Sequence, residues 1–336
     1  MNIGILFGGN SLEHEISIVT AYQLKKRLEK DYNINMIYMD YDNSLYIADK
    51  MKLNDFKCNN LRKLKKTSFN DKGVKGVDID CIILSVHGEN AEDGVAAALC
   101  RFYHIPYVGS NILASSIALD KYRCYKYLAS NGIKMIDSIL YTYEDYLSGK
   151  SIDIYPCIIK PVYGGSSIGI TVCKHSDELD DKLIEAFKIS KRLIIQRYYD
   201  NIEEYNLALY DNGVSRLEKI DIKNDYFTFE DKYVSEFKLM HKAMSDDSLY
   251  SKFKDIGRSV YNLLDASGII RIDFFMIEDE IYVNEVNIIP GALAMYLFDD
   301  FDRVIKECIN SSILKKYNTY SKGNFLAKSD INKWYI

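Results

Sequence analysis

The stretch that decides the fold is RIDFFMIEDEIYVNEVNIIPGALAMYLF, residues 271–298. Two runs of alternating apolar and polar residues flank a short acidic segment, a pattern that predicts a β-hairpin. Asp273 falls on the first predicted strand, and Glu285 and Asn287 fall on the second. Carboxylates in a buried strand are costly unless they are paired, so this hairpin is expected to hold partners for them.

The length of the turn decides which side chains of the hairpin face each other. A three-residue turn at 278–280 places Asp273 opposite Glu285, whereas a two-residue turn places Asn284 there. The first register gathers two carboxylates and the amide oxygen of Asn287, which are the ligands that Mg²⁺ prefers. The alternative is a half-exposed hairpin with one solvated face, and the hairpin alone does not decide between the two.

The segments before the hairpin predict a mixed region of strands and helices. The spacing predicts a helix from Asp120 with a C-terminal glycine at Gly132, and a helix from Asp246 to Ala266. Residues 157–172 read as a strand, a flexible loop and a strand. Three further strands are predicted to form one antiparallel sheet: 192–199, 205–211 and 215–222.

The N-terminal third alternates strands with helices, which predicts a parallel sheet covered on both faces. The predicted strands are 2–7, 33–40, 80–87 and 105–109, and the predicted helices are 11–30 and 93–103. The change in pattern predicts three domains: 1–115, 116–193 and 194–336.

The composition excludes several classes of function. The 336 residues carry a formal net charge of −5, which gives no reason to expect nucleic acid or an anionic membrane as a partner. No apolar run has the length of a membrane span, and the first residues lack a signal peptide pattern. The seven cysteines are scattered without a CxxC pair, which fits a reducing cytoplasm better than a disulfide framework or a zinc site.

The segment KPVYGGSSIG, residues 160–169, follows a buried strand and is rich in small residues. Its backbone N–H groups and hydroxyls suit phosphate oxygens, and Lys160 and Lys121 could supply positive charge. It is neither a Walker A loop nor a dinucleotide fingerprint. Taken alone, the segment is better explained as a flexible hairpin tip, but together with Lys121 and the acidic hairpin it favours nucleotide chemistry.

Six motifs, in order along nearly the whole chain, resemble those of the D-alanine–D-alanine ligase family of the ATP-grasp superfamily. They are LFGGNSLEHEIS (6–17), HGENAEDG (87–94), IPYVGSNILASSIALDK (105–121), IIKPVYGGSSIGI (158–170), YFTFEDKY (226–233) and RIDFF with NEVNIIPG (271–291). The resemblance implies a mixed α/β, three-domain ATP-grasp architecture with an N-terminal parallel-sheet domain.

The resemblance also implies a role for each residue that matches a family motif. At the nucleotide, the implied residues are Lys121, Lys160, Lys232 and Ser167 at the phosphates, Gln196, Arg197 and Tyr199 at the adenine, and Glu204 at the ribose. Asp273, Glu285 and Asn287 would hold two Mg²⁺ ions, which Mn²⁺ could replace. Glu15 would bind the ammonium group of the first D-alanine with Ser166 and Tyr233, and His87 would lie nearby. Arg271 and the N–H of Gly291 would form the oxyanion site.

The implied reaction is the joining of two D-alanines for peptidoglycan synthesis. The carboxylate of the first D-alanine attacks the γ-phosphoryl group of ATP, and the amine of the second attacks the resulting acyl phosphate. A lid made of the 165–167 loop and the 226–233 loop would exclude water. The resemblance further implies a cytoplasmic homodimer that acts on small molecules.

The segment PGALAMYLF departs from the family pattern at the second substrate. An alignment with a two-residue deletion puts Ala294 where the family has a serine that binds the second carboxylate. Losing that hydroxyl removes a hydrogen bond to a charged group, worth about 1.5–3 kcal/mol. A ligase with another amino acceptor, such as D-serine, is therefore the alternative, and an inactive nucleotide-binding relative is a second one.

Overall fold

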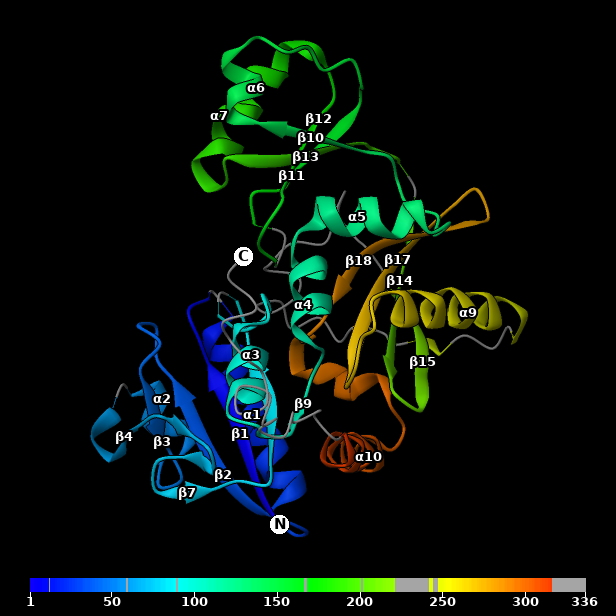
Figure 1. Cartoon of the computed structure of the whole chain (residues 1–336). Helices are drawn as coiled ribbons and strands as arrows, with labels where there is room; N and C mark the ends of the chain where they lie inside the picture. The colour runs from blue at the N-terminus through cyan, green and yellow to red at the C-terminus, as the bar shows by residue number, and fades with distance from the viewer. Residues whose placement is uncertain are drawn as a thin grey trace, which may run out of the picture.

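The computed structural model describes residues 1–11, 13–58, 60–88, 90–165, 168–200, 202–220, 242–243 and 247–315. The strands within these residues form three large sheets and one small one. In Figure 1 the sheet formed by residues 138–197 lies above the other two large sheets. The helix that begins at Lys121 lies between this upper sheet and the two lower ones.

The N-terminal sheet has the strand order β4-β3-β2-β1-β8-β9, with parallel pairing from β2 to β9 and an antiparallel edge at β3 and β4. β1 and β8 are almost entirely buried, as expected for central parallel strands. Its elements are β1 (Asn2–Gly8), α1 (His14–Leu28), β2 (Asn33–Met39), β3 (Leu45–Ile47), α2 (Leu53–Lys57), η1 (Leu61–Lys63), β4 (Lys65–Thr67), β8 (Cys81–Val86), α3 (Val95–Phe102), β9 (Tyr107–Val108) and α4 (Ile112–Leu119). The small sheet consists of β5 (Phe69–Asn70), β6 (Gly73–Val74) and β7 (Val77–Asp78).

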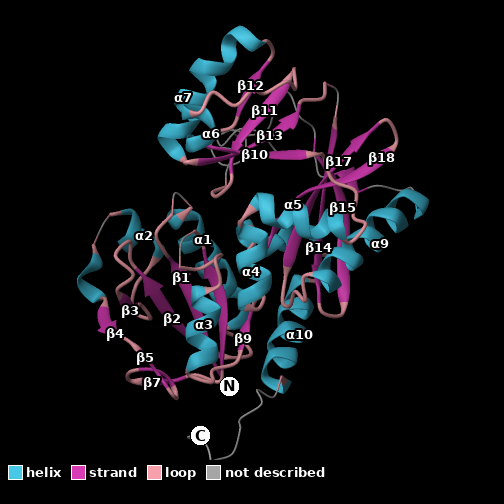
Figure 2. Ribbon diagram, turned by 45° about the horizontal axis from the view of Figure 1, so that its top comes forward, coloured by secondary structure: helices cyan, strands magenta, loops and turns pink. Residues whose placement is uncertain are grey.

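The central sheet has the order β10-β13-β11-β12 and is antiparallel throughout. Its strands are β10 (Ser138–Thr142), β11 (Cys157–Pro161), β12 (Thr171–Cys173) and β13 (Arg192–Arg197). The helices α6 (Tyr143–Leu147) and α7 (Leu179–Ile189) lie beside it (Figure 2), with the short 3-10 helix η2 (Ser176–Glu178) leading into α7. Ile159, Leu193 and Phe187 belong to a core that is separate from the main one.

The C-terminal sheet has the order β16-β15-β14-β17-β18. Its strands are β14 (Glu203–Tyr210), β15 (Gly213–Ile220), β16 (Lys242–Ala243), β17 (Ile270–Ile277) and β18 (Glu280–Asn287), accompanied by α9 (Asp247–Leu263), η3 (Gly291–Leu297) and α10 (Phe301–Leu314). Apolar residues of this sheet and of the N-terminal sheet, such as Ile270 and Leu84, belong to one continuous core. These two sheets therefore form a single packed body.

The prediction of one antiparallel sheet over 192–222 is wrong. β13 pairs with β10 and β11, whereas β14 and β15 pair with each other in the C-terminal sheet. The alternating pattern predicts a strand but not its neighbours, and tertiary packing separates the two groups. The predicted domain divisions at 115 and 193 fall inside α4 and β13.

The helix α5 (Lys121–Ser130) joins the two bodies. Asp120 is its N-cap and accepts a hydrogen bond from the backbone N–H of Arg123, as the sequence predicts, and Gly132 has the positive φ of a C-terminal glycine. Cys124 and Leu128 of α5 are buried in the main core. In both ribbon views α5 lies between the central sheet and the C-terminal sheet.

The hairpin of β17 and β18 reaches the metal-type register by an unexpected route. Its turn consists of the two residues Glu278 and Asp279, because Ile277 pairs with Glu280. Asp273 nevertheless pairs with Glu285, since a β-bulge between Asp273 and Phe274 shifts the register. The sequence predicted one register for a three-residue turn and another for a two-residue turn. Neither prediction included this bulge.

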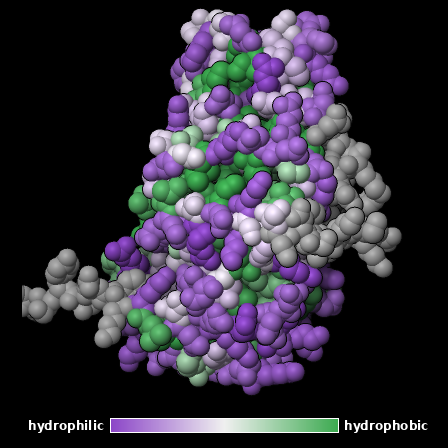
Figure 3. Space-filling view, turned by 90° about the vertical axis from the view of Figure 1, so that its right-hand side faces the viewer, coloured by the Kyte–Doolittle hydropathy of each residue, from purple (hydrophilic) through white to green (hydrophobic). Residues whose placement is uncertain are grey.

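Polar residues cover most of the face drawn in Figure 3, and its larger hydrophobic areas lie in the upper half. Among the described residues, no helix is both long and apolar enough to cross a bilayer.

Replacing Asp279 with glycine is expected to stabilise the protein. Glu278 and Asp279 both have positive φ, 50° and 64°, which is the geometry of a type I′ hairpin turn and is strained for residues with a side chain. Removing this strain should raise the free energy of unfolding by about 0.5–1 kcal/mol, after the greater entropy of glycine in the unfolded chain is subtracted. Denaturant unfolding measures the change. Asp279→Ala serves as the control, and a glycine variant less stable than the alanine variant would contradict this view of the turn.

Candidate active site

A cavity of about 120 Å³ lies between the central sheet and the C-terminal sheet. Its walls come from both sheets, from the start of α5 and from the glycine loop after β11. The lining residues include Lys121, Ser138, Ile158, Lys160, Tyr163, Gly164, Gly165, Ile194, Gln196, Glu204, Asp273, Phe275, Asn284 and Glu285. Six of the residues singled out in the sequence thus meet around one cavity: Lys121, Lys160, Gln196, Glu204, Asp273 and Glu285.

Asp273 is the most heavily partnered carboxylate of the site. The Arg271 guanidinium binds it through two nitrogens, with Nε 2.6 Å from Oδ1 and Nη2 2.9 Å from Oδ2. The Asn287 amide donates to Asp273 Oδ2 at 3.1 Å. Burial alone would lower the pKa of Arg271, but the charge of Asp273, the interaction with Tyr296 and the hydrogen bonds to both residues together outweigh it and hold that pKa well above its usual value. The predicted metal ligands are therefore brought together and neutralised by a fixed cation.

Asn206 completes this group and was missed by sequence reasoning. It lies directly across from Asp273 on β14. In the amide orientation that satisfies both of its polar groups, its nitrogen donates to Asp273 Oδ1 at 3.0 Å. The available signal was its position two residues after Glu204, which places both side chains on the same face of the strand.

Two lysines face the carboxylates across the cavity. Lys121 Nζ lies 3.0 Å from Glu285 Oε1 and also donates to the carbonyl oxygen of Gly164. Lys160 is buried, and burial lowers its pKa to about 8, although the charge of Glu285 acts in the opposite direction. Its Nζ lies 3.4 Å from Asn284 Oδ1 and 5.9 Å from the centre of the Phe275 ring. A buried amine with such weak partners is suited to an anionic ligand.

Gln196 presents an unused acceptor at the apolar end of the cavity. Its Nε2 donates to Ser138 Oγ at 2.8 Å, whereas its buried Oε1 has no hydrogen-bond partner among the described residues. Ile158 and Ile194 line the same cavity. An acceptor next to flat apolar walls fits a purine that carries an amino group. Arg197 and Tyr199, which were also predicted at the adenine, do not line the cavity.

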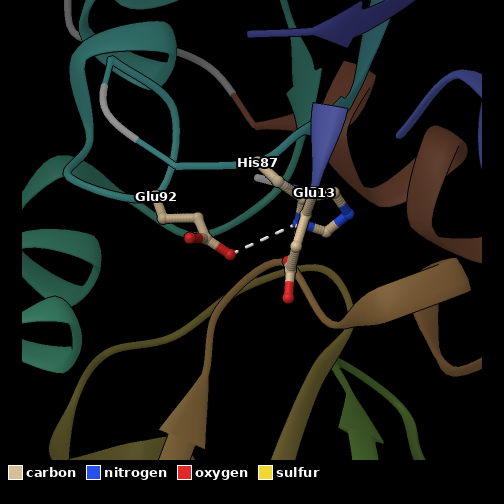
Figure 4. A group of neighbouring side chains, drawn as sticks. All are labelled: Glu13, His87 and Glu92. Carbon is tan, nitrogen blue, oxygen red and sulfur yellow. Dashed lines mark hydrogen bonds and ion pairs between the residues drawn. The ribbon is translucent and has the colours of Figure 1, made fainter. Parts of the chain in front are cut away.

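A second polar group lies at the ends of β1 and β8, where the N-terminal sheet approaches the glycine loop (Figure 4). His87 is buried, and its Nδ1 lies 3.4 Å from Glu92 Oε1 and 3.6 Å from Glu13 Oε2. Burial alone would lower the pKa of His87, but the hydrogen bond to Glu92 and the charges of Glu92 and Glu13 outweigh it, so this pKa is raised. A Cβ placed on Gly165 would lie 4.0 Å from Glu13 Oε1, which brings the glycine loop close to this group.

Glu15, the predicted ammonium-binding residue, does not join this group. It lies exposed in the first turn of α1, on the side of Tyr41, and its negative charge helps to raise the pKa of Tyr41 after the larger effect of burial. Glu13 is the N-cap residue of α1, two positions earlier. Because two helical positions differ by about 200° in direction, only one of these glutamates can face His87. The structure brings Glu13 there.

Ala294, predicted to face the second substrate, is fully buried in the main core. The residues Ala292, Leu293 and Ala294 have φ values of 51°, 46° and 52°, so η3 contains a left-handed turn where the sequence departs from the family pattern, and the inferred deletion stays a prediction. This turn brings Tyr296 to the site, with its hydroxyl 3.4 Å from Arg271 Nη1. Gly291 is the first residue of η3.

Four predicted site residues lie outside the described residues: Ser166, Ser167, Lys232 and Tyr233. Their predicted roles stay predictions.

Two sheets that enclose a cavity with lysines on one side and carboxylates on the other define an ATP-grasp fold. Family models described as D-ala D-ala ligase N-terminus and C-terminus match residues 2–110 and 122–303. The chain is 36% identical over 336 residues to the D-alanine–D-alanine ligase of Campylobacter lari, with 94% of each chain covered. It is 34% identical over 354 residues to that of Helicobacter pylori, with 99% of this chain and 100% of the relative covered.

A solved structure agrees with these relatives. The crystal structure of the Helicobacter pylori D-alanine–D-alanine ligase superposes with a TM-score of 0.79 at 33% identity, covering 94% of this chain and 100% of that one. This chain belongs to the D-alanine–D-alanine ligase family. The family and the fold class predicted from the sequence are confirmed.

Replacing His87 with glutamine is expected to change stability in a pH-dependent way. Because the folded pKa of His87 is raised, its charge stabilises the folded state fully below the unfolded value and this contribution is lost as the pH rises through the folded pKa. The difference in unfolding free energy between wild type and His87→Gln should therefore shrink as the pH rises above about 6.5. Urea unfolding at several pH values, with the exposed His175→Gln variant alongside, measures it. A difference that grows with pH would contradict the assignment.

Proposed function

We propose that this protein joins two D-alanines with ATP, through an acyl phosphate, to give D-alanyl-D-alanine, ADP and phosphate for peptidoglycan synthesis. The observation that carries the proposal is the cavity in which Lys121 and Lys160 face Asp273 and Glu285. Phosphoryl transfer between anions needs this pairing of fixed cations with carboxylates that bind a metal. The membership of the family supports the identity of the substrates.

ATP would lie along the cavity, with its base toward Gln196 and its phosphates toward the two lysines. The unused Oε1 of Gln196 would accept from the adenine amino group. Glu204 lines the cavity between these ends, as expected for a residue that binds the ribose hydroxyls. The phosphates would replace Glu285 as the partner of Lys121 Nζ. Ser167 and Lys232 are proposed to bind the same phosphates.

The hairpin fits divalent cations by its chemistry. Asp273 and Glu285 stand opposite each other, and Asn287 contacts Asp273, so two carboxylates and an amide are concentrated at one point of the sheet. We propose that these residues hold two Mg²⁺ ions, replaceable by Mn²⁺. When bound, the ions would offset the charge of the transferred phosphoryl group.

The first D-alanine would lie between the His87 group and the phosphate end of the cavity. We assign the binding of its ammonium group to Glu13 in place of Glu15, because Glu13 contacts His87 and lies close to Gly165. Ser166 and Tyr233 are proposed to support Glu13. The free carboxylate of this substrate then attacks the γ-phosphoryl group, and the glycine loop and the 226–233 loop would exclude water from the acyl phosphate.

The second step is the attack of an amine on the acyl carbon, with phosphate as the leaving group. Arg271 is held in place by Asp273 and would stabilise the oxyanion together with the N–H of Gly291. The relatives at 33% identity and above are named as ligases of D-alanine with D-alanine, so D-serine as the acceptor and an inactive protein are not favoured. We propose Tyr296, not Ala294, as the residue of η3 that faces the second substrate. We further propose a cytoplasmic homodimer, which fractionation and light scattering would test.

Replacing Asp273 with alanine should abolish the reaction. The change removes a metal ligand and leaves Arg271 without its partner, so the release of ADP in the presence of D-alanine should fall by roughly 10²–10³-fold. Glu280→Gln, an exposed change on the same hairpin, should keep the wild-type rate within about twofold. A coupled assay for ADP measures both variants, and product analysis identifies the dipeptide. Wild-type turnover by Asp273→Ala would refute the proposed centre.

Glu13 and Glu15 can be separated by matched substitutions. Glu13→Gln should raise the KM of the first D-alanine by about 10–100-fold, because a charge-assisted hydrogen bond to the ammonium group is lost. Glu15→Gln should change it by less than about twofold, because its side chain is exposed. Initial rates at saturating ATP measure both. The opposite ranking would return the role to Glu15.

A further inference from the structure

The junction of α5 with the central sheet contains an ion cluster of Asp120, Tyr163 and Arg192, here named the junction cluster. Its carboxylate is buried, whereas Tyr163 is 43% and the Arg192 side chain 28% exposed. Asp120 is 2% exposed. Its Oδ2 accepts from Arg192 Nη1 at 2.9 Å and from the Tyr163 hydroxyl at 3.0 Å, and Arg192 Nη1 lies 2.6 Å from the same hydroxyl. Burial alone would raise the pKa of Asp120, but the hydrogen bond from the backbone N–H of Arg123, those from Arg192 and Tyr163 and the charge of Arg192 together outweigh it and hold this pKa below its usual value.

The junction cluster joins the two bodies of the protein. Asp120 caps α5, whose residues Cys124 and Leu128 are buried in the main core. Arg192 begins β13 of the central sheet, which has its own core, and its guanidinium carbon lies 5.4 Å from the centre of the Tyr163 ring. A carboxylate that is withdrawn from water and bound by groups of another body fixes the position of that body strongly.

The phosphate end of the cavity is attached to this cluster on both sides. Lys121 directly follows Asp120, and its backbone N–H donates to the carbonyl oxygen of Val162 at 3.2 Å. Tyr163 directly precedes Gly164, whose carbonyl oxygen accepts from Lys121 Nζ. The same Nζ pairs with Glu285 of the hairpin. A shift of the junction cluster would therefore displace both the lysine and the start of the glycine loop.

We infer that the junction cluster positions Lys121 and the start of the glycine loop, which would bind the phosphates. Arg192, which does not line the cavity, is then a positioning residue for the nucleotide. This inference rests on the proposed function only in placing the ATP phosphates between Lys121 and the glycine loop. Arg192 acts by fixing Asp120 and the Tyr163 hydroxyl, so its removal lets the base of the loop separate from the start of α5. The site of the first D-alanine is built mainly on Glu13 and His87, at the ends of β1 and β8, and shares the glycine loop with the phosphate-binding residues, so we expect a smaller effect there.

The test compares two arginines that bind the same carboxylate oxygen. Arg192→Met should raise the KM of ATP about tenfold or more and the KM of the first D-alanine by a several-fold smaller factor. Arg192→Lys keeps a charge and should recover part of the loss. Arg123→Met is the matched control: Arg123 Nη1 also binds Asp120 Oδ2, at 2.5 Å, but its side chain is 64% exposed and it belongs to α5 itself. This variant should change the KM of ATP by less than about twofold.

Direct titration of each variant with ATP gives the second readout. The dissociation constant should follow the KM of ATP, with Arg192→Met weakest and Arg192→Lys intermediate. If Arg192→Met does not fold, Tyr163→Phe, which removes only the hydroxyl of the cluster, replaces it. An unchanged dissociation constant, or an equal rise in the KM of ATP and of D-alanine, would overturn the inference. Binding requires no turnover, so a wild-type protein that binds ATP without forming dipeptide would overturn the proposed function and leave this test intact.

Discussion

The bidentate ion pair between Arg271 and Asp273 is the interaction on which the site depends. Both residues stand on the same face of β17, two positions apart, so the arginine is fixed by its own strand and not by a mobile neighbour. This pairing offsets the cost of placing a carboxylate in a half-buried sheet. It also leaves one edge of the guanidinium directed at Tyr296 and η3. One contact thus orders the metal-binding group and the oxyanion group together.

The sequence was sufficient to predict the family and part of the elements, but not β3, α7 or α10, nor how the strands are shared among the sheets. The apolar run in 192–199 predicts a strand, and nothing in that pattern distinguishes pairing with β11 from pairing with β14. The hairpin shows the same limit. Its two-residue turn alone would place Asn284 opposite Asp273, but the bulge at Asn284 shifts the register so that Asp273 pairs with Glu285. Register depends on such local irregularities, which residue pattern alone does not encode.

The candidate site was predictable where a motif has one chemically suitable residue, and not where it has two. The motifs that contain Lys160, Gln196 and Asp273 each offer one side chain of the required chemistry. All three of these side chains line the cavity. Glu13 and Glu15 share one motif, and only the direction of the first turn of α1 separates them. Tyr296 escaped prediction because its segment departs from the family pattern, and the left-handed turn before it, which precedes the contact with Arg271, cannot be read from the residues. No sequence pattern predicts three successive non-glycine residues with positive φ, since each of these conformations is strained.

The division of the hydrophobic residues into two cores has a consequence for access to the cavity. The central sheet buries its apolar side chains within itself, and the other two sheets bury theirs together. Ion pairs and hydrogen bonds supply prominent contacts between the two bodies, such as that between Arg192 and Asp120. Because the two cores are separate, the distance between the two bodies can change without exposing either core.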